Sequence, residues 1–144
     1  MDSNESRENG KLLRSIYEAA RSNDWETLLS RFHPDVVLHE TPALRVGGTY
    51  RGMAEVGPVL AELGAVLDQS TLQVEYICAG EDHAVASLIV QALDGGGEIR
   101  LSEHATIQDG QITEIRVFYW DTGVVNAALD RPSREVPAAN VLSG

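Results

Sequence analysis

The amino-acid sequence predicts an α+β domain in which N-terminal helices cover one face of a curved, mainly antiparallel sheet. Apolar residues recur with the helical period of about 3.6 before Thr71, and with the strand period of two from there to Asp121. Short turns separate the later apolar runs, and such turns join antiparallel neighbours. The length of 144 residues suits one domain, because a chain of this size buries a sufficient core without disulfides.

Three helices and one short strand are expected before Thr71. Asn23 and Glu26 have the spacing of a capping box, which opens the second helix. Pro34 ends that helix because proline lacks an amide donor, and Pro58 indicates a kink or a late start in the third. The expected helices cover about residues 9–22, 23–33 and 53–67, and the strand covers 36–38.

Four strands are expected after Thr71, joined by turns that contain Gly80, Gly95 to Gly97 and Asp109-Gly110. The strands cover about residues 71–79, 83–93, 98–108 and 111–121. We expect a flexible N-terminus over residues 1–9, the folded domain over 10–129 and a flexible tail over 130–144.

Charge and composition exclude several kinds of partner. The net charge of -11 repels nucleic acid and anionic lipid surfaces, and the apolar runs are too short to cross a bilayer. The first residues lack the pattern of a secretory signal, so a cytoplasmic location is expected. The single cysteine, Cys78, alternates with Leu72, Val74 and Tyr76, and we expect it to be a small buried residue.

Two strands carry candidate functional residues. Glu40 follows Val36 and Leu38 on one face of the first strand, either as a site carboxylate or as a solvated strand end. On the strand 98–108 the polar face meets water, a partner or a pocket, so His104 is either an acid–base group or a surface histidine. The apolar face of that strand holds Ile99, Leu101, Ala105 and Ile107, and the polar face holds Arg100, Ser102, His104 and Thr106.

From about residue 10 to residue 128 the chain resembles the nuclear transport factor two-like superfamily, and within it the SnoaL-like polyketide cyclases and the ketosteroid isomerases. Four segments carry the resemblance: Asn23-Asp24-Trp25, His33-Pro34-Asp35-Val36-Val37-Leu38, Asp109-Gly110-Gln111-Ile112 and Phe118-Tyr119-Trp120-Asp121. The resemblance implies a cone-shaped barrel with an apolar pocket between the helices and the sheet, and a homodimer packed through the sheet.

The resemblance also implies a catalytic set of His104, Glu40 and Asp121. Glu40 falls where the isomerases keep their carboxylate base, and His104 and Asp121 match placements typical of the cyclases. Strand alternation puts Trp120 and Asp121 on opposite faces, so Asp121 has an alternative role as the cap of a helix. The expected substrate-binding residues are Tyr17, Trp25, Phe32, Arg100, Ser102, Phe118, Tyr119 and Trp120.

Two departures from the relatives' patterns limit the comparison. The isomerases use a tyrosine on the first helix where this chain has Ile16, and Tyr17 lies about 100 degrees away around the helix. The Asp-Arg-Asp arrangement of the superfamily's epoxide hydrolases is only partly matched, by Arg100 and Asp121, because Ser102 stands in place of the second aspartate.

These observations favour a cofactor-independent enzyme that cyclises or isomerises a polyketide-type or carbonyl-bearing apolar intermediate in secondary metabolism by acid–base catalysis. The alternatives are a ring-forming enzyme of the epoxide hydrolase type and a non-catalytic module that binds a ligand or dimerises. No metal is expected, since the four histidines lie on separate elements. We also expect a homodimer, because the apolar face with Ile99 and Leu101 needs a cover if the polar face lines the pocket.

Overall fold

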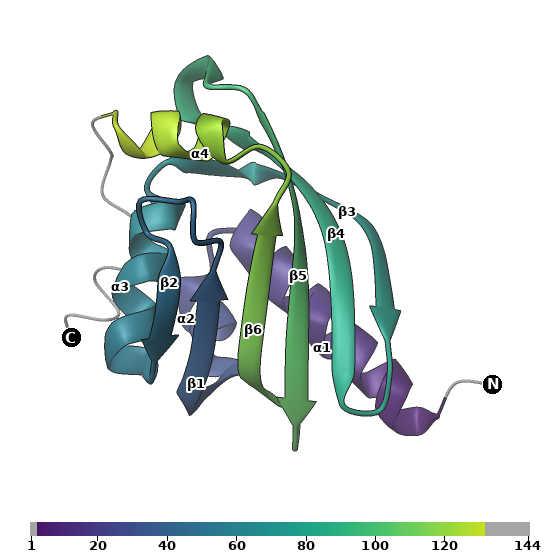
Figure 1. Cartoon of the computed structure of the whole chain (residues 1–144). Helices are drawn as coiled ribbons and strands as arrows, with labels where there is room; N and C mark the ends of the chain where they lie inside the picture. Colours follow the sequence, from purple (N-terminus) through teal and green to yellow (C-terminus); the bar gives the residue numbers. More distant parts are fainter. Residues whose placement is uncertain (1–2, 132–144) are drawn as a thin grey trace.

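The computed structural model describes residues 3–131, which form a six-stranded sheet with helices on one side (Figure 1). The helices are α1 (Asn4–Arg21), α2 (Trp25–Ser30), α3 (Met53–Gly64), α4 (Thr122–Leu129) and the short 3-10 turn η1 (Leu93–Gly95). The strands are β1 (Phe32–Glu40), β2 (Gly48–Arg51), β3 (Leu67–Ala79), β4 (His83–Ala92), β5 (Glu98–Gln108) and β6 (Gln111–Tyr119).

The strands lie in the order β2-β1-β6-β5-β4-β3, and β1 and β6 form the parallel pair in this otherwise antiparallel sheet. Helices α1, α2 and α3 lie behind the sheet in Figure 1, and α4 crosses its upper end. We call the sheet face toward α1 to α3 the inner face and the opposite one the outer face. The predicted α+β class with a mainly antiparallel sheet is confirmed.

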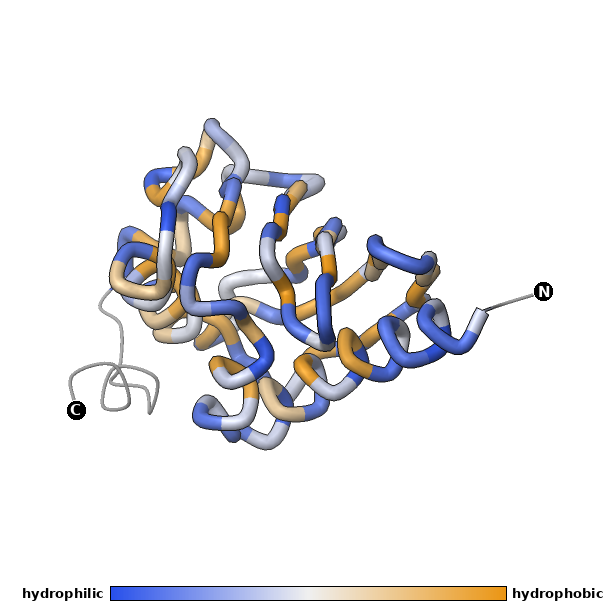
Figure 2. Tube along the Cα trace, turned by 90° about the horizontal axis from the view of Figure 1, so that it is seen from below, coloured by the Kyte–Doolittle hydropathy of each residue, from blue (hydrophilic) through white to orange (hydrophobic). Residues whose placement is uncertain are grey.

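The core lies between the inner face and the helices. Leu13 and Ile16 on α1 are buried against inner-face residues such as Leu88 and Ile112. Figure 2 shows the apolar segments of helices and strands turned toward this shared interior, with hydrophilic segments at the N-terminal turns of α1. Burial of these side chains holds the helices against the sheet, since each contributes about 1.5–3 kcal/mol.

The first helix begins earlier than expected, at Asn4 rather than near residue 9. The hydroxyl of Ser3 accepts a hydrogen bond of 3.0 Å from the amide of Ser6, which caps the helix. Residues 4–9 are therefore part of the helix, and the expected start of the folded domain at residue 10 stays a prediction. The expected C-terminal tail lies almost wholly outside the described residues, which end at residue 131.

The region around Pro34 also differs from expectation. Helix α2 ends at Ser30, and β1 already begins at Phe32 with Pro34 inside it. The register between β1 and β6 is irregular between Phe32 and Val37, so the missing amide of proline interrupts no regular ladder. Strand β2, which pairs with β1, was not predicted at all.

An extra residue in β3 reverses the faces of its second half. The register with β4 shifts between Val74 and Tyr76, as at a β-bulge. Val74 packs on the core before the shift and Ile77 does so after it. Cys78 is consequently exposed, and its predicted burial is wrong because simple alternation from Leu72 ignores the bulge.

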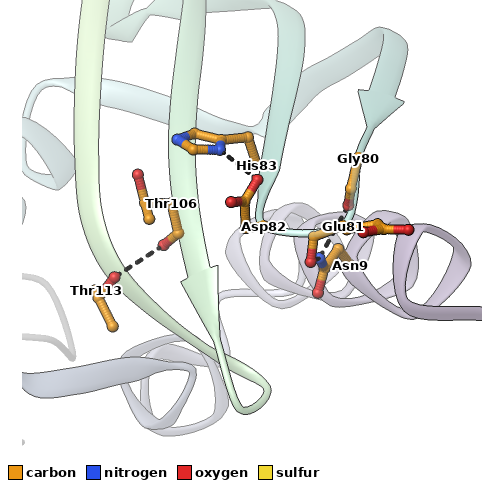
Figure 3. A network of polar contacts seen from close by, with 7 residues as sticks. All are labelled: Asn9, Gly80, Glu81, Asp82, His83, Thr106 and Thr113. Atoms are coloured by element: carbon orange, nitrogen blue, oxygen red, sulfur yellow. Dashed lines mark hydrogen bonds and ion pairs between the residues drawn. The ribbon is translucent and has the colours of Figure 1, made fainter.

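Polar contacts at the turn between β3 and β4 attach the start of α1 to the sheet (Figure 3). The side-chain amide of Asn9 donates to the carbonyl oxygens of Gly80 and Glu81, at 3.0 and 2.9 Å. These bonds join the start of α1 to the turn between β3 and β4. They fix the helix that carries Tyr17 relative to the inner face.

Candidate active site

A cavity of about 110 Å³ lies between the inner face and helices α1 to α3. Its walls are mostly aliphatic and aromatic side chains from these helices and from every strand except β2. Its polar lining residues are Tyr17, Glu40, Gln69, Glu103 and Tyr119. The lining residues Leu67, Gln69, Leu101 and Tyr119 are half-buried, so the cavity opens beside them, near the start of β3 and the end of β6.

Glu40 occupies the last position of β1 and points into this cavity. Val36, Leu38 and Glu40 alternate on the inner face, and Glu40 is only 3% exposed. Its Oε1 atom is buried and has no hydrogen-bond partner within residues 3–131. Burial, followed by the charge of Glu103, raises the pKa of Glu40 to about 8.

The next turn of chain holds this strand end in place. The hydroxyl of Thr41 donates a hydrogen bond of 2.8 Å to the carbonyl oxygen of Val117 on β6. Val117 in turn pairs with Glu103 across the ladder between β6 and β5. Glu40 and Glu103 therefore reach the cavity from strands on either side of β6.

Glu103 extends from the inner face of β5, where it pairs on the β4 side with the fully buried Ala86. The hydroxyl of Tyr17 donates a hydrogen bond of 2.8 Å to Oε1 of Glu103. Burial raises the pKa of Glu103, although the hydrogen bond from Tyr17 acts in the opposite direction. Tyr17 lines the cavity even though it is displaced around α1 from Ile16.

Both tyrosine hydroxyls of the cavity stay protonated. Burial, then the neighbouring charge and hydrogen bond of Glu103, raises the pKa of Tyr17 well above its ordinary value. Burial, followed by the charges of Glu40 and Glu103, does the same to the pKa of Tyr119. The site thus combines two carboxyl groups that favour the neutral form with two phenols that can donate hydrogen bonds.

His104 does not lie in the cavity. It is exposed on the outer face of β5, where its ring packs edge-on against Phe118 with centroids 4.9 Å apart. The expected orientation of β5 is reversed: the apolar set with Ile99 and Ala105 faces the helices, since burial of these side chains outweighs any gain from enclosing a histidine. Arg100 and Ser102 lie on the outer face with His104.

Asp121 lies beyond the end of β6 and is exposed. Its Oδ1 accepts hydrogen bonds from the amides of Gly123 at 2.9 Å and Val124 at 3.4 Å. The alternative interpretation as a helix cap is confirmed, because α4 begins at Thr122. The expected alternation is also present: Tyr119 lines the cavity, whereas Trp120 is 87% exposed.

The structure thus divides the predicted site residues into two groups. Glu40 and four of the expected binding residues line the cavity: Tyr17, Trp25, Phe32 and Tyr119. His104, Asp121 and the other expected binding residues do not: Arg100, Ser102, Phe118 and Trp120. The expected cluster of His104, Glu40 and Asp121 is therefore not brought together. Arg100 and Asp121, the two residues of the partial epoxide hydrolase pattern, also lie outside the cavity.

Two polar residues of the cavity were not predicted from the sequence, Gln69 and, as the ionisable one, Glu103. Glu103 lies midway between Leu101 and Ala105, inside the apolar face of β5. A glutamate at the centre of an otherwise apolar strand face is the signal that could have identified it, since an ionisable group is rarely buried without a reason. Within residues 3–131 no group of three or more histidine, cysteine, aspartate or glutamate residues is arranged to hold a metal ion.

The fold and the cavity define an α+β cone of the nuclear transport factor two-like type. Residues 13–115 match the SnoaL-like domain, and the chain belongs to this family. No curated protein matches the chain. No helix within residues 3–131 combines the length and apolar character needed to cross a membrane.

Solved structures of the same fold include three informative relatives. A cystatin-like protein of unknown function from Xanthomonas campestris is 28% identical, with a TM-score of 0.72 over 84% of this chain and 97% of that one. TerC, co-crystallised with polyporic acid, is 23% identical, with a TM-score of 0.70 over 86% and 99%. A putative SnoaL-like polyketide cyclase from Jannaschia sp. CCS1 is 14% identical, with a TM-score of 0.75 over 92% and 99%.

Proposed function

We propose that the protein is a cofactor-independent enzyme that moves a proton on carbon next to a carbonyl group, in the isomerisation or cyclisation of an apolar, polyketide-type intermediate. One observation carries the proposal: the buried carboxyl group of Glu40 and the half-buried one of Glu103 share an apolar cavity, and Oε1 of Glu40 has no partner within residues 3–131. A buried carboxyl oxygen without a hydrogen-bond partner destabilises the folded protein. Such groups are concentrated at functional sites, where a bound ligand can supply the partner.

In this mechanism Glu40, in its ionised form, takes the proton from the carbon beside the carbonyl group. The electron pair of the broken C–H bond moves onto the carbonyl oxygen and forms an enolate. Protonated Glu103, supported by Tyr17, donates a hydrogen bond to that oxygen, as a neutral carboxylic acid can in an apolar site. Glu40 then returns the proton to a different carbon, so that atoms and electrons balance without a cofactor.

The predicted roles of His104 and Asp121 stay predictions, but their exposure favours Glu40 and Glu103 as the proton-transfer pair. Small-molecule chemistry on this fold is consistent with TerC, whose structure was determined with polyporic acid. The cyclising reaction agrees with the name of the Jannaschia protein of the same fold, a putative SnoaL-like polyketide cyclase.

We also propose a homodimer, now packed through a different surface. The expected apolar face of β5 is part of the interior, so it needs no partner. Instead, the outer face and its edge expose Tyr76 (57%), Phe118 (48%) and Trp120 (87%), an unusual concentration of aromatic surface. Light scattering at micromolar concentration should give the dimer mass, and Phe118→Glu should give the monomer; a wild-type monomer would contradict the proposal.

The reaction is tested with 3-cyclohexen-1-one, whose isomerisation to 2-cyclohexen-1-one creates a conjugated enone that absorbs in the ultraviolet. Wild-type protein should accelerate the shift, and Glu40→Gln should abolish most of the acceleration. If the wild-type protein binds the ketone and leaves the rate unchanged, the protein is a binding module.

A further inference from the structure

The charge of the cavity limits what it can bind. No arginine, lysine or histidine is among its lining residues within the described part of the chain. A carboxylate or phosphate inside it would lose its hydration without gaining a cation, and would lie beside Glu40 and Glu103. The available polar groups suit an uncharged ligand with one hydrogen-bond acceptor.

The volume sets a second limit. A cavity of roughly 150 Å³ holds one benzene molecule. The cavity of about 110 Å³ is somewhat smaller, so one six-membered ring is the largest unit that it can enclose without moving side chains. Two fused rings require a longer cavity.

Trp25 forms part of the cavity wall, next to Gly64 at the end of α3. It is 5% exposed, and its indole Nε1 donates a hydrogen bond of 2.7 Å to Oδ1 of Asn23. On its other side the ring packs on Gly64 of α3, where an added Cβ would lie 2.8 Å from Cη2 and Cζ2 of Trp25. The hydrogen bond and the α3 backbone fix the indole from two sides, so it cannot withdraw to enlarge the cavity.

We propose that the cavity selects uncharged carbonyl compounds built on a single ring, and that Trp25, fixed between Asn23 and Gly64, sets this size limit. The carbonyl group in this substrate class rests on the proposed function. The limits on charge and size rest on the lining residues and on the volume alone.

Ligand titrations followed by NMR test the proposal with three ketones: cyclohexanone, the two-ring 1-decalone and the anionic 4-oxocyclohexanecarboxylate. Wild-type protein should bind cyclohexanone at least tenfold more tightly than either of the others. Trp25→Phe should bring the affinities for cyclohexanone and 1-decalone within threefold of each other. The phenyl ring is smaller than the indole, which enlarges the cavity, and it lacks the N–H group that bonds to Asn23. Gly64→Ala should push the indole inward and weaken cyclohexanone binding at least threefold.

Trp120→Ala is the matched control, because it removes an exposed tryptophan outside the cavity and should leave all three affinities unchanged. Trp25→Phe and Gly64→Ala change the cavity in opposite directions, so either folded variant tests the role of Trp25. Equal wild-type affinity for 1-decalone or for the carboxylate would overturn the size or charge limit. An unchanged ranking in the folded Trp25 or Gly64 variant would remove Trp25 from the proposal.

The proposed proton transfer and the proposed selectivity can be refuted independently of each other. If the wild-type protein shows the expected ranking but does not isomerise 3-cyclohexen-1-one, the selectivity stands and the proton transfer is refuted. If isomerisation occurs while 1-decalone binds as tightly as cyclohexanone, the proton transfer stands and the size limit is refuted.

Discussion

Glu103 and His104 are neighbours in sequence and face opposite sides of the same strand. Glu103 points into an apolar cavity, where burial raises its pKa and Tyr17 bonds to it at 2.8 Å. His104 lies in solvent on the outer face, beside Phe118 and 3.4 Å from the hydroxyl of Ser102. Histidine is the commoner acid–base residue near neutral pH, but here the glutamate has the environment that changes its chemistry.

The comparison shows that the environment of a titratable group matters more than its type. The exposed histidine lies on a face that is open to water. A buried carboxyl group changes its protonation, and it acts where water does not compete for hydrogen bonds. Substitutions on the two faces of the sheet test whether function belongs to the inner face alone.

The largest expected effect is that of Glu40→Gln, which removes the proposed base from the cavity. Turnover of 3-cyclohexen-1-one should fall by about 10²–10⁴-fold, the usual contribution of a positioned base. Glu114→Gln is the matched control, since Glu114 is exposed and pairs with His39 on the outer face. It should retain wild-type turnover in the same ultraviolet assay, and a similar loss in both variants would break the comparison.

The second test sets the two neighbours against each other. Glu103→Gln should lower turnover by about 10²–10³-fold, as loss of an oxyanion-stabilising donor does. His104→Ala should keep turnover within twofold, measured on folded protein by the same assay. A large loss in His104→Ala with normal thermal stability would restore the predicted role of the histidine.

The pH dependence gives a smaller, graded effect. Glu40 acts as a base only when ionised, and its pKa is raised to about 8. Below that value kcat/KM should rise about tenfold per pH unit, and above it the rate should level off. A rate that is flat between pH 6 and 8 would show that Glu40 is not the group that must lose its proton.

The free energy of unfolding should fall as the pH rises toward 8, whereas kcat/KM rises. Between the ordinary glutamate value of 4.5 and the raised value, the folded protein holds a proton that the unfolded chain releases. This contribution to the free energy of unfolding is complete below pH 4.5 and is lost as the pH rises toward 8, at most about 1.4 kcal/mol per unit. Thermal denaturation should show that the stability of Glu40→Gln falls less between pH 4.5 and 8 than the stability of the wild-type protein does. An identical fall in both proteins would indicate that other groups cause it.

Much of the fold follows from residue patterns that act over short distances. The bounds of β5 are those expected, because a regular alternation and the Asp109-Gly110 turn define them. Both turn residues have positive φ, 51° and 75°, as a tight hairpin turn requires. The bulge in β3 and the irregular start of β1 were not predictable, since a one-residue shift depends on how neighbouring strands pair.

The candidate site was only partly predictable, for a related reason. Glu40 was identified because it extends the apolar series of Val36 and Leu38, and all three are buried. His104 was assigned to the cavity because the polar face of β5 was expected to line it. The sequence pattern separates two faces of a strand, but which one the helices cover depends on burial summed over the whole face, and there Ile99 and Ala105 decide.

The smallest expected effect concerns Asp121, where capping and catalysis predict different outcomes for two substitutions. Asp121→Ala removes the acceptor for the amides of Gly123 and Val124, so it should cost about 1 kcal/mol and lower Tm by about 3 °C. Asp121→Asn keeps a side-chain oxygen that can cap α4 and should retain wild-type stability. Turnover should be unchanged in both variants, because the cavity is built without Asp121. If Asp121→Asn instead retains its Tm and loses turnover, the carboxylate has a chemical role that capping does not explain, and function extends beyond the inner face.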